Sequence, residues 1–142
     1  MREILYRAKN AKGEWEYGVP LIGGLNGEVA YITQMHSYNH WVEAETIGQY
    51  TGLLDKNGVR IFDGDIIKHH RTLWGEDASD FGIVYWDGDT CRFLRTSKIS
   101  PSETPTIGGR AAESYEVIGN IFDDLDLAKE LGYFDNPRFL EG

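Results

Sequence analysis

Short hydrophobic runs alternate with polar residues along most of this chain, and turn-forming residues separate the runs. In the N-terminal third, such runs occupy residues 3–8, 15–19 and 29–33, with predicted turns at 10–13 and 23–27. This alternation is typical of half-buried strands. The first third is therefore predicted to be β-structure, with a loop at 35–39 and a stretch at 41–47 that alternates too weakly for its faces to be assigned.

The middle of the chain continues the pattern with hairpins. Asn57-Gly58 predicts a type I′ turn, because that turn needs positive φ at both central residues, and Asp87-Gly88 is a second hairpin sequence. Residues 97–114 are rich in Ser, Pro, Thr and Gly and are a predicted mobile or functional loop. The remaining predicted elements are strands at 59–62, 65–70, 82–86, 90–95 and 115–122 and an acidic loop at 74–80.

Helical periodicity is expected in the tail alone. Asp123 or Asp124 can cap a helix in which Leu125, Ala128 and Leu131 share one stripe. Gly132 stands where a left-handed residue ends many helices. Many short strands and one helix predict a small β-barrel or a pair of them.

Composition narrows the class of protein. A chain of 142 residues that is 41% hydrophobic can form one domain, or one domain with an appendage. It lacks an apolar run of about 18 residues, and charges interrupt the N-terminus where a signal peptide is apolar. Cys91 is the single cysteine, which excludes an internal disulfide and a CxxC zinc site. A cytoplasmic location is expected.

The net charge of −9 is unevenly distributed. Residues 1–50 carry four basic and six acidic groups, residues 51–122 carry eight and eleven, and residues 123–142 carry two and six. Almost half of the excess is therefore in the tail. The acidity opposes non-specific DNA binding, but it leaves room for a local basic face.

Several motifs follow one another in the middle of the chain and carry a family resemblance. They are Gln49-Tyr50-Thr51-Gly52-Leu53, Asp55-Lys56-Asn57-Gly58, Ile61-Phe62-Asp63-Gly64-Asp65-Ile66-Ile67 and the later Val117-Ile118-Gly119-Asn120-Ile121-Phe122. This order resembles the YopX family of small phage- and prophage-encoded proteins. The resemblance covers residues 47–122; the family often continues with Asn-Pro, whereas this chain has Asp123-Asp124-Leu125-Asp126.

The resemblance implies an SH3-type barrel, a phage or prophage origin and no established activity, and it brings no catalytic residues. It implies structural roles for Gly52, Asn57, Gly58, Gly64, Asp65, Gly119 and Asn120. We therefore expect a mainly β fold: an SH3-like barrel at 51–122, an N-terminal β segment at 1–50 that forms its own sheet or completes the barrel, and an acidic tail with a short helix at 123–142.

A basic cluster is the main candidate for binding chemistry. If the strand at 65–70 meets the hairpin at 82–95, Lys68, His70, Arg71, Arg92, Arg95 and Lys98 form one patch near Trp74, Trp86 and Phe93. Single-stranded nucleic acid is bound by such mixtures of cations and aromatic rings. The alternative, which we favour, is that Trp86 and Phe93 are core and the cations pair with Glu76, Asp77 and Asp80.

Metal and catalytic sites are weaker hypotheses. His36 and His40 have a ligand-like spacing, but a loop separates them. Neither Asp63-Gly64-Asp65 nor Asp87-Gly88-Asp89 has the later positions of a calcium loop, so both are interpreted as turns. A metal-dependent hydrolase would use His69 or His70 with Asp63 or Asp65. Cys91 is expected to be a small buried hydrophobe, and no cofactor is predicted.

The aromatic residues favour protein interaction. Trp15, Trp41 and Trp74 lie near predicted loops and are candidate interface anchors. The leading hypothesis is a non-enzymatic module that associates with itself and with a host or phage protein. Nucleic-acid binding through the basic patch is the alternative, and a metal-dependent hydrolase is the weakest of the three.

Overall fold

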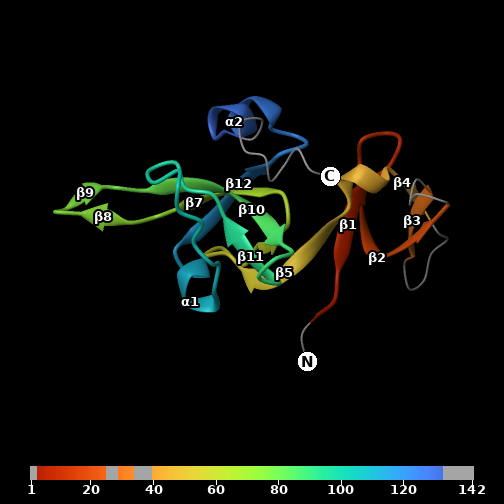
Figure 1. Cartoon of the computed structure of the whole chain (residues 1–142), viewed down its shortest axis with the longest axis horizontal. Coiled ribbons are helices and arrows are strands. Elements are labelled where there is room, and N and C mark those ends of the chain that lie inside the picture. The colour runs from red at the N-terminus through yellow and green to blue at the C-terminus, as the bar shows by residue number, and fades with distance from the viewer. Residues whose placement is uncertain (1–2, 25–28, 34–39, 133–142) are drawn as a thin grey trace. The chain divides into compact units, whose positions relative to one another are not determined.

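The computed structural model describes residues 3–24, 29–33 and 40–132, which fall into two compact units, Met1–Gly52 and Leu53–Gly142. Both units consist mainly of antiparallel strands (Figure 1). The predicted mainly β class, with additional N-terminal strands and a short C-terminal helix, is confirmed. Within the described ranges, the strands pair in separate sheets without closing a barrel, and no helix is long and apolar enough to cross a bilayer.

The first unit is an antiparallel sheet in the order β4-β3-β2-β1-β5. Its elements are β1 (Tyr6–Lys9), β2 (Trp15–Gly23), β3 (Val29–Thr33), β4 (His40–Val42), the 3-10 turn η1 (Ala44–Thr46) and β5 (Gly48–Leu54). The β1–β2 hairpin forms because Asn10 Oδ1 accepts hydrogen bonds from the backbone of Lys12 and Glu14. One face of the sheet is buried at Ala8, Ala30 and Ile32.

The second unit contains a four-stranded antiparallel sheet in the order β11-β10-β7-β12. Its strands are β7 (Asp65–His69), β10 (Asp80–Asp87), β11 (Arg92–Arg95) and β12 (Tyr115–Asn120), and β6 (Arg60–Phe62) borders the end of β5. Beyond His69 and Asp80, the chain continues as a two-stranded ribbon of β8 (Thr72–Leu73) and β9 (Glu76–Asp77).

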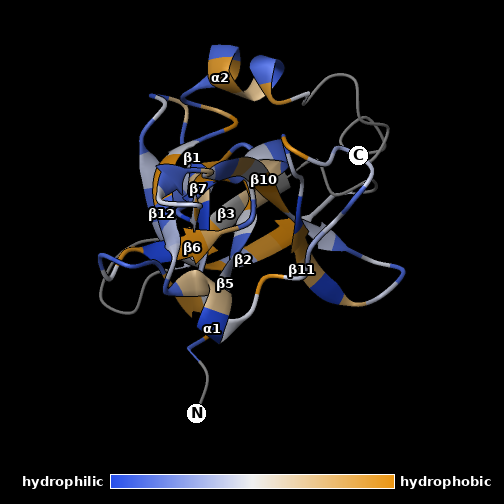
Figure 2. Cartoon of the chain, turned by 90° about the vertical axis from the view of Figure 1, so that its left-hand side faces the viewer, coloured by the Kyte–Doolittle hydropathy of each residue, from blue (hydrophilic) through white to orange (hydrophobic). Residues whose placement is uncertain are grey.

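Side chains alternate between the two faces of this sheet, and each face has its own core. On one face, Ile67, Val84 and Tyr115 pack with Ile61 and Ala112. On the other face, Ile66 and Ile83 pack with Ala128. The short helices α1 (Gly109–Ala112) and α2 (Leu125–Glu130) therefore lie on opposite sides of the sheet (Figure 1). Hydrophobic and hydrophilic residues alternate along α2 (Figure 2), as a helix with one buried stripe requires.

The turn type predicted for Asn57-Gly58 is wrong, although both predicted hairpins form. In the described chain, Trp74 and Cys91 are the only non-glycine residues with positive φ, so Asn57 does not adopt the type I′ conformation. Instead, Gly58 alone is left-handed there, and Asp55 Oδ1 accepts from the backbone of Asn57 and Val59 at 2.8 and 2.9 Å. At the other hairpin, Asp87 pairs with Arg92, so the loop extends from Gly88 to Cys91.

The predicted loop at 97–114 is held to the sheet along its length. Leu94 forms an isolated β-bridge with Thr106, and Arg95 N donates to Pro105 O at 3.0 Å. Ile107 and Ala112 are buried, and α1 lies within this segment. In the tail, Asp124 is the N-cap residue as predicted, but its Oδ2 accepts from Asn120 N instead of capping the helix.

Candidate functional site

The predicted basic patch is divided between the two faces of the sheet. Lys68 pairs with Phe81 across β7 and β10, and Arg95 pairs with Val84 across β10 and β11. Because successive residues of a strand point to opposite faces, Lys68 lies on the α2 side and Arg95 on the α1 side. Arg92 is opposite Asp87, about 20 Å along β10 from Phe81. The six cations therefore do not form one surface.

Arg95 is buried in a polar network and is not available to a ligand on the surface. Its guanidinium donates to Asp80 Oδ2 at 3.0 Å, to Tyr115 Oη at 3.3 Å and to His69 Nδ1 at 3.1 Å. Arg95 is 4% exposed and Asp80 2%. The placement of Arg95 in a nucleic-acid patch is thus wrong. Its pairing with Asp80 agrees with the hypothesis that we favoured, in which the cations pair with nearby carboxylates.

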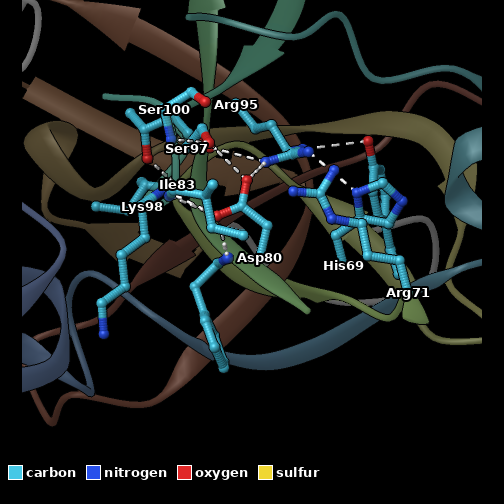
Figure 3. Close-up of polar contacts among 12 residues, drawn as sticks. His69, Arg71, Asp80, Ile83, Arg95, Ser97, Lys98 and Ser100 are labelled. Atoms are coloured by element: carbon cyan, nitrogen blue, oxygen red, sulfur yellow. Dashed lines mark hydrogen bonds and ion pairs between the residues drawn. The ribbon is translucent and has the colours of Figure 1, made fainter. Parts of the chain in front are cut away.

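Asp80 also holds the chain that follows β11. Its Oδ2 accepts from Ser97 Oγ at 2.6 Å, and its Oδ1 accepts from the backbone of Lys98 and Ile99, each at 3.0 Å (Figure 3). One carboxylate therefore joins β10 to β11 and to the beginning of the connection at 97–108.

The electrostatics of the network follow from these contacts. Burial raises the pKa of Asp80, but hydrogen bonds from Ser97, Ile99, Arg95 and Phe81 outweigh it and lower that pKa to about 2. Burial and the positive charges of Arg95 and Arg71 lower the pKa of His69. Arginine has no acceptor atom, so His69 Nδ1 must be unprotonated to accept from Arg95.

The other cations of the predicted patch have separate environments. Lys68 Nζ and Lys98 Nζ lie 6.0 and 5.8 Å from the centroid of the Phe81 ring, a residue that the sequence analysis did not select. His70 Nε2 is 2.8 Å from Glu116 Oε1. Arg71 Nε donates to Ala78 O at 2.9 Å, and Arg92 Nε donates to Thr90 Oγ1 at 3.2 Å.

Two of the predicted interface tryptophans share one face of the first unit. Trp15 lies on β2 beneath Arg7 and Lys9, whose Cζ and Nζ atoms are 4.3 and 4.5 Å from the ring centroid. Trp41 is 68% exposed and projects from the same face, because Leu21 is opposite Tyr31 and Tyr31 is opposite Trp41. The exposed apolar residues Tyr17, Val19 and Leu21 alternate along β2 on this face.

We call this surface the β2 face and define it as Trp15, Tyr17, Val19, Leu21 and Trp41. The opposite face of the same sheet holds the buried Ala30 and Ile32. The β2 face is therefore the outer side of the sheet, with apolar residues where a solvated sheet normally has polar ones.

Trp74 lies in the second unit, at the tip of the β8–β9 ribbon, and is 93% exposed. Trp86, which the sequence favoured as core, is 48% exposed and makes an edge-to-face contact with the half-buried Phe93. Cys91 is exposed rather than buried, because it occupies a left-handed position in the β10–β11 loop with a φ of 53°.

The residues of the hydrolase hypothesis do not come together. His69 contacts Arg95 and His70 contacts Glu116 from opposite faces of the sheet. Asp65 is buried, accepts from Phe62 N at 2.7 Å, and lies about 13 Å along β7 from His69. His40 Nδ1 is 3.6 Å from Glu16 Oε1, while His36 is outside the described residues. Within the described ranges, no three His, Cys, Asp or Glu side chains are grouped to hold a metal ion.

Comparison with known families decides the relationship of this chain. A family model described as YopX protein matches residues 6–128, from the first strand into α2. The chain belongs to the YopX family. Among the solved structures, protein EF1440 from Enterococcus faecalis is similar over 89% of this chain and 99% of its own, with 23% sequence identity and a TM-score of 0.49. Comparison with the curated proteins gives no match.

The YopX motif residues are placed at turns and backbone contacts in this chain. Gly64 has a φ of 89°, and a Cβ at Gly119 would clash with the Asp124 carboxylate at the bulge of β12. Asn120 Oδ1 accepts from the backbone of Phe122 and Asp123. Asp55 Oδ2 accepts from Val117 N at 2.9 Å, which joins the second motif to the last one.

The buried ion pair makes a testable contribution to stability. We expect Arg95→Met to lower the free energy of unfolding by about 3–5 kcal/mol, because it leaves the Asp80 carboxylate buried without its counter-charge. The double variant Asp80→Leu, Arg95→Met should lose much less than the sum of the two single variants. Urea denaturation of all four proteins measures the coupling, and additive effects would contradict it.

Acid should weaken the same network in two steps. The depressed pKa of His69 lets the unfolded chain bind a proton first, so stability falls as the pH drops through about 6.5. The lowered pKa of Asp80 adds about 2 kcal/mol to the free energy of unfolding at any pH above 3.8, the pKa of this carboxyl in the unfolded chain. This contribution is lost as the pH falls towards about 2.

Thermal melts of the wild type and of His69→Gln measure the first step. The variant should lose less stability than the wild type from about pH 7 to about pH 5. Parallel curves for the two proteins would show that His69 does not carry this dependence.

Proposed function

We propose that this protein is a non-enzymatic interaction module of phage or prophage origin that works in the cytoplasm of a bacterial host and associates with copies of itself through the β2 face. The observation that carries the proposal is the apolar outer side of the first unit. Tyr17, Val19 and Leu21 are each about half exposed, and Trp41 is more exposed still. Contiguous exposed apolar surface marks interaction sites in soluble proteins.

Charge supports a second copy as the partner of the β2 face. The chain carries a net charge of −9, which opposes close approach of two copies over most of the surface. Beside the β2 face, Arg7 and Lys9 lie over the Trp15 ring, and the exposed Glu43 follows two residues after Trp41. The five residues that define the β2 face are uncharged, and aromatic residues are enriched in the centres of interfaces.

The test is a pair of neighbouring charge substitutions on β2. Leu21→Lys places a cation on the β2 face, whereas Ile22→Lys places it on the opposite face at a residue that is at least as exposed. We expect Leu21→Lys to weaken self-association by at least about tenfold, or about 1.4 kcal/mol. Ile22→Lys should leave self-association nearly unchanged.

Sedimentation velocity over a range of protein concentrations measures both variants. A wild-type protein that stays monomeric, or equal dissociation by both substitutions, would contradict self-association through the β2 face. Circular dichroism of each variant controls for loss of the fold.

A second candidate function is single-stranded nucleic-acid binding at the Phe81 site, defined as Lys68, Phe81 and Lys98. Neither ammonium group has an ion pair with any residue that the structure describes, and both lie near one half-buried ring. Cations neutralise phosphates while an aromatic ring stacks on a base in such sites. This smaller site replaces the six-residue patch.

Fluorescence anisotropy with a labelled single-stranded oligonucleotide tests the Phe81 site. Binding at low salt should weaken for Lys68→Ala and for Lys98→Ala, and each variant should reduce the salt slope by about 0.7. Arg92→Ala is the matched control, because Arg92 lies at the other end of the sheet. No binding at low salt, or an equal effect of Arg92→Ala, would dismiss this function.

A further inference from the structure

The turn between β8 and β9 has an unusual residue at its first central position. Leu73 is opposite Glu76, so Trp74 and Gly75 form a two-residue hairpin loop. Their φ angles are 55° and 80°, which is the type I′ arrangement. Asn, Asp or Gly normally takes the position of Trp74, because a bulky residue is strained at positive φ. The chain therefore keeps a tryptophan where a smaller residue would be more stable.

The ring of Trp74 contributes nothing to the core that could offset this strain. It is 93% exposed, and the adjacent Leu73 is 60% exposed. Every residue from 71 to 77 is exposed. The ribbon extends away from the four-stranded sheet of its unit (Figure 1). Strained residues that the fold does not need are concentrated at functional sites.

The base of the ribbon holds the tip in place. Ala78 N donates to Arg71 O and Arg71 Nε donates to Ala78 O, each at 2.9 Å. Asp77 Oδ1 accepts from Ser79 N at 3.0 Å and from Ser79 Oγ at 2.5 Å. The next residue is Asp80, which is fixed by the buried network. Trp74 is therefore presented on a pre-ordered arm, which reduces the entropy lost on binding.

The charges beside the tip define the kind of partner. Glu76 and Asp77 are exposed directly after the turn, and hydrogen bonds from Ser79 lower the pKa of Asp77. Two carboxylates next to the ring oppose nucleic acid and anionic membranes. The β2 face of a second copy is also a poor partner for these two carboxylates. Its neighbouring cations, Arg7 and Lys9, already lie over the Trp15 ring.

We propose that this ribbon is a docking element that inserts Trp74 into an apolar pocket with a rim of Lys or Arg on a different protein. Leu73 extends the apolar contact, and Glu76 and Asp77 pair with the rim. A buried tryptophan surrounded by polar contacts is the usual form of an interface hot spot. This surface is separate from the β2 face, so it does not depend on self-association.

The first part of the test needs no partner. Trp74→Asn places a favoured residue in the same turn, so the variant should melt at the same temperature as the wild type or at a higher one. A lower melting temperature would show that the ring stabilises the fold, and it would overturn the proposal. Trp86→Ala is the matched control, because Trp86 is half exposed but its ring contacts Phe93. This variant should melt at a lower temperature than the wild type.

The second part measures docking in a lysate of the bacterial host with the full chain. A benzophenone amino acid at Leu73 should cross-link to a discrete protein, and Trp74→Asn should reduce the yield at least fivefold. Glu76→Lys with Asp77→Lys should reduce it similarly, and the cross-linked peptide should be apolar with Lys or Arg beside it. The same label at Asp89, in the exposed β10–β11 loop, should not give this product.

Three results would overturn the proposal: products that do not depend on Trp74, products that disappear with nuclease, and cross-links to a second copy of this chain. These results are independent of the sedimentation of Leu21→Lys. Failure of docking is therefore distinguishable from failure of self-association.

Discussion

The ion pair between Asp80 and Arg95 organises the second unit, because four separate parts of the chain meet at it. Asp80 is on β10 and Arg95 on β11, while the contacts of Arg95 reach His69 on β7 and Tyr115 on β12. Burying two charges is costly unless each is paired and hydrogen-bonded. Here the carboxylate accepts from two backbone groups beyond β11, so the ion pair also fixes the start of the long connection.

Other buried carboxylates also accept hydrogen bonds from the backbone, as Asp80 does. Asp55 binds the backbone of Asn57, Val59 and Val117, and Asp65 binds that of Phe62. These carboxylates provide bonds that the strand ladders cannot make at a turn or a bulge. Part of the acidic composition is thus structural, and the net charge of −9 overstates how many carboxylates are available for recognition.

The sequence predicted the strands well and their environment poorly, for a physical reason. Alternation is local, so β3 and the hairpins were visible in short windows. The conformation of Asn57 depends on the carboxylate of Asp55, and the burial of Arg95 depends on Asp80, which is 15 residues away. The alternation of Tyr17 and Val19 indicated a strand, but no local pattern tells whether such a face is core or surface. The predicted acidic loop at 74–80 is wrong, because β9 and the first residue of β10 lie there. Trp74-Gly75 is not one of the usual hairpin turn sequences, so no local signal marked the ribbon.

We propose different roles for these two surfaces: the β2 face contacts another copy of the chain, and the ribbon tip stays exposed for a different protein. Hydroxyl-radical footprinting of the purified protein at rising concentration measures both at once. We expect Tyr17, Leu21 and Trp41 to become protected as the copies associate, while the oxidation of Trp74 does not change. Protection of Trp74 with no change on the β2 face would contradict this proposal.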